Sequence, residues 1–141
     1  MKPPRSQREK MGIRYERRVH TRLLDAWGFG NYFPSQWFVF GDGERAHYFQ
    51  PDGILLLANP NRIAIVEVKY QHTPDAFWQL EHFYLPLLRC FFRRASRPLV
   101  TVEVCKWYDP AVPFPRSVRM VEDLGHLRPG DFNVHILNRP D

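Results

Sequence analysis

Two charged residues, Glu67 and Lys69, interrupt a run of apolar residues that otherwise has the composition of a core β-strand. They stand in the segment 63–69, which reads IAIVEVK. Side chains alternate between the two faces of an extended chain, so both charges share a face with Ile63 and Ile65. Burying a charge is costly unless the charge is paired. We therefore expect a compensating group close to this strand.

Asp52 is the candidate partner, because it lies on the strand before. Two strands joined by a tight turn with Asn and Pro are predicted here, at residues 48–57 and 63–70. If Leu57 pairs with Arg62, Asp52 falls opposite Glu67. A turn that is tighter by one pair places Asp52 opposite Lys69 instead. In either register the carboxyl groups of Asp52 and Glu67 share a face, with Cβ atoms within about 8 Å.

Two carboxylates held beside a lysine suit a hard divalent cation. They repel each other, and Lys69 offsets only part of that repulsion. Mg²⁺ takes oxygen ligands and keeps several waters, and Mn²⁺ is expected to substitute for it. The carbonyl of Val68 is a further candidate ligand. Such a site could activate water near Lys69 for attack on phosphorus; the alternative is a salt-bridged network of Glu67, Lys69 and Asp52 that serves only the fold.

Pro51-Asp52, followed after fourteen residues by Glu67-Val68-Lys69, resembles the signature of the PD-(D/E)xK nuclease superfamily. The predicted order of helix, three strands, helix and strand is also similar to the restriction-endonuclease-like core of that family. The resemblance covers roughly residues 12–107. It implies an α/β fold with a mixed central sheet flanked by helices, and Mg²⁺-dependent hydrolysis of phosphodiester bonds, in DNA in preference to RNA. In that reaction Asp52, Glu67 and Lys69 would be catalytic.

The resemblance assigns roles to two further residues. An acidic residue on the first helix often completes the metal site in this family, and Glu16 lies on the inward stripe of the helix expected at residues 12–27. Some branches carry a glutamine on the helix after the lysine, and Gln79 fits that position. The alternatives are a surface ion pair for Glu16 and a satisfied polar group in a buried helix for Gln79.

Within the superfamily, the short chain resembles archaeal-type Holliday-junction resolvases, which work as dimers, or stand-alone phage or transposon-type nucleases. A homodimer is therefore one expectation. His72, just after Lys69, could contact a phosphate or transfer a proton; the alternative is a surface or core histidine. A rival from another class is a nucleic-acid-binding or scaffold protein that kept the fold without catalysis.

Positive charge is concentrated at the start of the chain. Residues 1–22 hold eight basic and two acidic residues, a net charge of +6, whereas the remaining residues sum to −1. Such a segment suits a polyanion, because each neutralised phosphate releases a counterion; a solubilising tail is the alternative. The residues expected to contact nucleic acid here are Lys10, Arg14, Arg17 and Arg18. A second cluster ends a later helix, where it could only complement the helix dipole: Arg89, Arg93, Arg94 and Arg97.

The hydrophobic pattern predicts one domain. We expect a flexible basic arm at 1–11 and a nuclease domain at 12–141, with its core at 12–107 and a small C-terminal addition at 108–141. Besides the helix and the hairpin given above, the predicted elements are a strand at 37–40, a helix at 73–94, a strand at 99–107, a short helix at 117–124 and a strand at 132–137. The helix at 73–94 is apolar on nearly all sides, which predicts burial, and Pro86 should kink or split it.

Several other classes find no support in the 141 residues. No run of about 18 apolar residues would span a membrane, and no secretory signal precedes the domain. Cys90 and Cys105 stand in stretches expected to be core, so neither a disulfide framework nor a zinc site is predicted, and the expected compartment is cytoplasmic. Neither a GxSxG elbow nor a phosphate-binding GxxxxGK[ST] loop occurs. We expect no organic cofactor.

Overall fold

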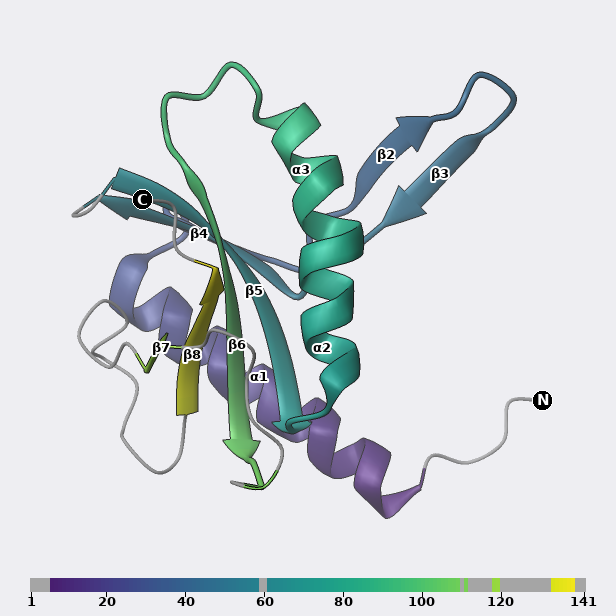
Figure 1. The fold of residues 1–141 in the computed structure, drawn as a ribbon. Coiled ribbons are helices and arrows are strands. Elements are labelled where there is room, and N and C mark those ends of the chain that lie inside the picture. Colours follow the sequence, from purple (N-terminus) through teal and green to yellow (C-terminus); the bar gives the residue numbers. More distant parts are fainter. Residues whose placement is uncertain (1–5, 59–60, 110, 112–117, 120–132, 139–141) are drawn as a thin grey trace.

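The computed structural model describes residues 6–58, 61–109, 111, 118–119 and 133–138, and within them a mixed sheet is flanked by helices (Figure 1). Among these residues the sheet has six strands in the order β1-β4-β5-β6-β8-β7, and β2 and β3 form a separate ribbon. The elements are α1 (Gln7–Trp27), β1 (Tyr32–Pro34), β2 (Phe38–Gly41), β3 (Ala46–Phe49), β4 (Gly53–Ala58), β5 (Asn61–Gln71), α2 (Pro74–Trp78), the π-helix η1 (Gln79–Tyr84), α3 (Leu85–Phe91), β6 (Leu99–Trp107), β7 (Val118–Arg119) and β8 (Asn133–Asn138). The expected α/β class is therefore confirmed.

Helix α1 begins five residues before the predicted start at Gly12. Ser6 is its N-cap, and the Ser6 hydroxyl accepts a hydrogen bond from the backbone N–H of Glu9 at 3.1 Å. Residues 7–11, expected to belong to a flexible arm, are helical as a result. The helix ends where predicted, at Gly28, whose φ of 80° is a conformation that glycine adopts easily.

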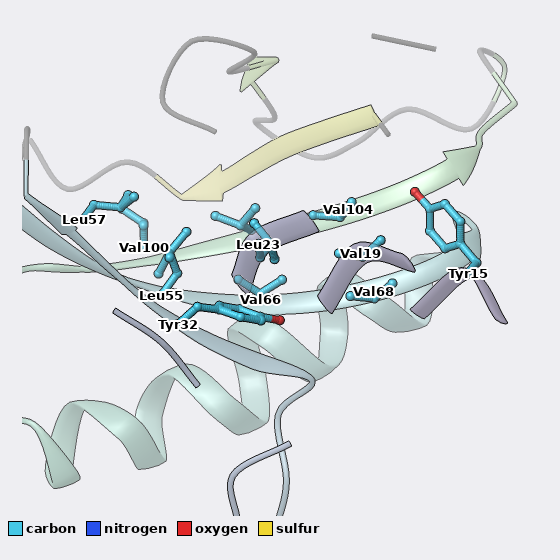
Figure 2. Close-up of a cluster of buried hydrophobic side chains, with 12 residues drawn as sticks. Tyr15, Val19, Leu23, Tyr32, Leu55, Leu57, Val66, Val68, Val100 and Val104 are labelled. Atoms are coloured by element: carbon cyan, nitrogen blue, oxygen red, sulfur yellow. The ribbon is translucent and has the colours of Figure 1, made fainter. Parts of the chain in front are cut away.

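Helix α1 packs on one face of the sheet (Figure 2). Its buried side chains, Tyr15, Val19 and Leu23, lie against the alternating valines and leucines of the central strands. Those strand residues are Leu55 and Leu57 of β4, Ala64, Val66 and Val68 of β5, and Val100, Val102 and Val104 of β6. The opposite face of β5 therefore carries Glu67 and Lys69 with the isoleucines, as the alternation predicted.

The second helical layer, which crosses from β5 to the parallel strand β6, is not one regular helix. A π-helix, η1, separates α2 from α3, and Pro86 occupies the first turn of α3. Proline has no N–H and its ring displaces the carbonyl four residues back, which explains the change of hydrogen-bond register. The layer is also not fully buried, contrary to expectation: it covers the sheet with Leu80, Leu85 and Leu88. Its outer side exposes Trp78 and Phe91.

The strand expected at 48–57 is interrupted. β3 ends at Phe49 and pairs only with β2, whereas β4 begins at Gly53 in the main sheet. Pro51 cannot donate a hydrogen bond to a ladder, which explains a break at this point. The short strand β1 was not predicted. The strand expected at 132–137 is confirmed as β8, but Val118 and Arg119 form a strand rather than the expected helix, most of which lies outside the described residues.

Candidate active site

Asp52 lies where the ladder between β4 and β5 ends. That ladder pairs Leu57 with Arg62 and ends at Gly53 opposite Val66, so continuing the register places Asp52 beside Glu67. The first of the two predicted registers is thus confirmed. The Oδ2 atom of Asp52 accepts a hydrogen bond of 2.7 Å from the backbone N–H of Val68, which fixes this carboxyl group against β5.

Glu67 and Lys69 lie two residues apart on the same face of β5. The Lys69 ammonium is 3.6 Å from Oε1 of Glu67. Glu67 is 5% exposed, whereas Lys69 is half-buried and reaches solvent. The other oxygen of Glu67, Oε2, is buried and has no hydrogen-bond partner within the described part of the chain. A buried carboxyl oxygen in that condition is costly, and a bound cation would satisfy it.

Glu16 approaches this cluster from α1. Its Oε1 lies 3.3 Å from Nε2 of His20, one turn further along the helix. The other ring nitrogen of His20, Nδ1, lies 2.7 Å from the hydroxyl of the buried Tyr32. His20 and Tyr32 thus hold the carboxyl group that the metal site was expected to use. Neither was singled out from the sequence, although Glu16 and His20 have the i, i+4 spacing of facing helical residues.

Gly53 leaves the space that Tyr32 occupies. A Cβ atom at Gly53 would collide with the ring and hydroxyl of Tyr32. We expect Gly53→Ala to destabilise the protein by about 1–3 kcal/mol, because the buried ring must move. Thermal unfolding measures this, with Gly12→Ala as the control, since no atom lies within 4 Å of a Cβ added there. Equal melting temperatures for Gly53→Ala and wild type would contradict the packing described.

The three carboxyl groups and Lys69 shift one another's protonation. Burial raises the pKa of Asp52 to about 6, and nearby Glu16 adds to that rise. Burial, and then the charge of Asp52, raises the pKa of Glu67 to about 9. Lys69 counteracts part of both shifts. The pKa of Glu16 is lowered, chiefly by its hydrogen bond with His20. The raised pKa values of Asp52 and Glu67 reflect the cost of holding two carboxylates away from water, which Lys69 offsets only in part.

The donor set suits a hard cation by type. Glu16, Asp52 and Glu67 offer carboxyl oxygens, and the unpartnered Oε2 of Glu67 is one of them. In an extended strand the N–H and C=O of one residue point toward the same neighbour, so the Val68 carbonyl lies on the side of Asp52. Within the described residues, however, no three side chains of His, Cys, Asp or Glu are arranged so that they could hold a metal ion. The side chains of Glu16, Asp52 and Glu67 would therefore have to rotate in order to surround a cation.

Gln79 is the first residue of η1, which contacts β5. Its Oε1 is buried and, among the residues that the structure describes, has no hydrogen-bond partner. This is the same condition as that of Glu67 Oε2. The next residue, Leu80, packs with Ile63 and Ile65 on the face of β5 that carries Glu67 and Lys69, and the role that the resemblance assigns to Gln79 stays a prediction.

The basic residues expected to contact nucleic acid are not gathered at this cluster. Lys10, Arg14, Arg17 and Arg18 are all exposed on α1. The three arginines line a shallow groove of about 500 Å³ together with Thr21, Arg22 and Asp25. Because the buried side chains of α1 face the sheet, this groove lies on the outer side of the helix. Any phosphate contact there would be at a distance from Asp52.

His72 does not lie where a phosphate could reach it. Its side chain is 1% exposed, and Nδ1 lies 2.6 Å from Oε2 of Glu103, which is fully buried on β6. The expected contact between His72 and nucleic acid is therefore wrong. Burial lowers the pKa of His72 and raises that of Glu103 to about 8, so burial favours the neutral form of each side chain. Glu103 was missed, although the alternation of Val102 and Val104 places it on the face of Glu67.

This buried pair should matter for stability. We expect His72→Ala to lower the free energy of unfolding by about 1–3 kcal/mol, because it leaves the carboxyl group of Glu103 without a partner for one of its oxygens. Chemical denaturation measures the difference. His82→Ala, at an exposed position on η1, is the control and should change stability by less than about 0.5 kcal/mol. A loss no larger than that of the control would show that the pair contributes nothing.

Comparison of the chain with family models, with curated proteins and with solved structures finds no match. None of the helices in the described ranges is both long and apolar enough to cross a membrane. The functional class consequently depends on the chemistry available to Glu16, Asp52, Glu67 and Lys69. That chemistry combines clustered carboxyl oxygens, an adjacent ammonium group and partial access to solvent.

Proposed function

We propose that the protein is a Mg²⁺-dependent nuclease with a restriction-endonuclease-like core, which hydrolyses phosphodiester bonds in DNA. One observation carries the proposal: half-buried Asp52, just before β4 begins, and buried Glu67 of β5 meet beside half-exposed Lys69. Burying two acids this close costs stability, as their raised pKa values indicate. Lys69 and the backbone N–H of Val68 offset only part of that cost, and a catalytic role would account for the rest.

Each residue has a distinct task in this proposal. Glu16, Asp52, Glu67 and the carbonyl of Val68 would hold Mg²⁺ or Mn²⁺. Once bound, such an ion stabilises negative charge on the phosphate and makes water easier to deprotonate. Lys69 would position and polarise the attacking water, since its ammonium group is the cation nearest to Glu67 in the described structure. Gln79 would assist from η1.

The DNA backbone would be contacted by the exposed arginines of α1. Phosphate contacts carry no base information, so recognition of DNA shape rather than sequence fits this arrangement. A homodimer that cuts branched DNA symmetrically, as in the resolvases, is the narrower version of the proposal. A monomer without preference for branched DNA would exclude that version and leave the nuclease assignment intact. The proposed location is cytoplasmic.

Nicking of supercoiled plasmid tests the assignment. Wild type should convert the plasmid to relaxed circles with Mg²⁺ or Mn²⁺ and not with EDTA, and Asp52→Ala should not. Glu44→Ala, which removes an exposed carboxylate from the turn between β2 and β3, is the matched control and should remain active. Equal nicking by Asp52→Ala would identify a contaminant. Salt-dependent DNA binding without cleavage of linear, branched or single-stranded substrates would favour the non-catalytic binding protein instead.

A further inference from the structure

The β2–β3 ribbon carries aromatic residues on both of its faces. Its inner face packs against the end of α3: the ring of Phe38 stacks on Phe49 at 5.3 Å and meets Phe91 edge-on at 5.0 Å. Its outer face carries Val39 and Tyr48, which are register partners on β2 and β3. Tyr48 is 69% exposed, and Trp37, just before β2, is 67% exposed. The ribbon projects from the body of the molecule beside α3 (Figure 1).

A groove of about 470 Å³ lies along this ribbon. Its lining includes Trp37, Val39 of β2, Phe91 of α3 and Leu56 of β4. This volume lies within the range of small-molecule sites, about 300–1,000 Å³. Large apolar residues that stay exposed together usually mark a binding surface. The aromatic character of the walls suits flat ring systems.

The chain on both sides of Phe91, a residue that lines the groove, is basic. Arg89 of α3 and Arg93 and Arg94 just after it are exposed and flank Phe91 in the chain. No acidic residue occurs between His82 and Val102. A second copy of this chain is a poor occupant, because it would bring the same arginines and its own net charge of +5. An apolar, aromatic groove next to a basic stretch of chain instead matches a nucleic acid whose bases are unpaired, with rings to stack and phosphates to pair.

The ribbon also leads directly into the candidate active site. β3 ends at Phe49, three residues before Asp52. The connection is braced by Tyr84 of η1, whose ring stacks on Phe49 at 5.9 Å and whose hydroxyl donates to the carbonyl oxygen of Gln50 at 3.5 Å. The chain that leaves the ribbon at Phe49 therefore reaches Asp52 of the carboxyl cluster within three residues.

We propose that this groove, together with the exposed outer face of the ribbon beside it, binds the unpaired bases of a single-stranded segment. Trp37 in the groove and Tyr48 on the outer face would stack on the bases, and the arginines after Phe91 would contact the phosphates. The inference rests on the proposed nuclease function and specifies its substrate: a nucleic acid with a single-stranded region next to the bond that is cut. Stacking on aromatic side chains tolerates any base, so this surface selects for unpaired structure rather than sequence.

Fluorescence anisotropy with a labelled oligothymidylate and a blunt duplex of equal length tests the proposal. Both are titrated in EDTA, so that binding is measured without cleavage. We expect the double variant Trp37→Ala/Tyr48→Ala to bind oligothymidylate at least about tenfold more weakly than wild type, and the duplex within about twofold. Trp37→Phe/Tyr48→Phe keeps the rings and should restore most of the affinity. Trp107→Ala removes another exposed tryptophan, at the end of β6, and should bind like wild type.

Three results would overturn the proposal: no measurable binding of oligothymidylate by wild type, an equal loss on both DNAs, or no loss on either. Light scattering measures whether the groove binds a second copy of the chain instead. A wild-type dimer that becomes monomeric in the alanine variant would assign the groove to self-association, which would also overturn the proposal. A different result would overturn the nuclease assignment. Selective binding of unpaired DNA, without cleavage once Mg²⁺ is added, supports the groove and overturns only the catalytic assignment.

Discussion

Replacing Lys69 with alanine is expected to lower the single-turnover rate of DNA cleavage by about 10³-fold. The Lys69 ammonium is 3.6 Å from Glu67 and opposes the raised pKa values of both Glu67 and Asp52. Its loss removes a positive charge from the place where negative charge would develop on the phosphate. A group in that position typically contributes about 10²–10⁴-fold through proton transfer or charge stabilisation.

Quenched-flow cleavage of end-labelled DNA at saturating enzyme measures this rate. Lys106→Ala is the matched control, because Lys106 is a half-buried lysine on the neighbouring strand that has no part in the proposed chemistry. It should cleave within about threefold of wild type. The affinity of Lys69→Ala for DNA should stay close to that of wild type, because the substitution removes at most one contact with a phosphate. A Lys69→Ala rate equal to that of the control would remove Lys69 from the mechanism.

The second large effect is expected on replacing Glu67, which should abolish activity and increase the stability of the fold. Its pKa rises from an ordinary value near 4.5 to about 9, so between these values the folded protein holds a proton that the unfolded chain has released. The free energy of unfolding therefore falls as the pH rises through this window. Glu67→Gln removes that pH-dependent cost while keeping the shape of the side chain. We expect this variant to be inactive yet, without divalent ions, more stable than wild type at pH 8, by on the order of a few kcal/mol.

Melting temperatures in EDTA from about pH 5 to pH 8 measure this difference. The difference in melting temperature between Glu67→Gln and wild type should increase as the pH rises. In a chain of this size, each kcal/mol of unfolding free energy corresponds to about 3 °C. Glu44→Gln, at an exposed position in the ribbon turn, should show no such increase. A Glu67→Gln protein that melts below wild type at pH 8 would mean that the Glu67 carboxyl group supports the fold, as a structural network would require.

The geometry of the site followed from two features of the sequence. Alternation in 63–69 placed Glu67 and Lys69 on the face of Ile63 and Ile65, because successive side chains of an extended chain point to opposite faces of the sheet. The Asn-Pro turn then limited the register, and the observed pairing of Leu57 with Arg62 is one of the two that it allowed. Local chemistry was sufficient here because every step involved neighbouring strands.

Features set by distant parts of the chain were not predictable in the same way. The burial of His72 depends on Glu103, thirty-one residues away on a strand that pairs in parallel with β5. The support of Glu16 by Tyr32 requires β1, which is too short to leave a pattern. The exposure of Trp78 and Phe91 depends on which side of an apolar helix faces the sheet, and a helix apolar on all sides gives no periodic signal for this.

Binding of Mn²⁺, followed by electron paramagnetic resonance with a cleavage-resistant phosphorothioate duplex present, tests most directly whether Asp52 and Glu67 hold a catalytic cation. We expect wild type to bind Mn²⁺, and Asp52→Asn and Glu67→Gln to lose that binding while Asp25→Asn retains it. Unchanged Mn²⁺ binding in Asp52→Asn and Glu67→Gln, or none in wild type, would contradict the proposed site.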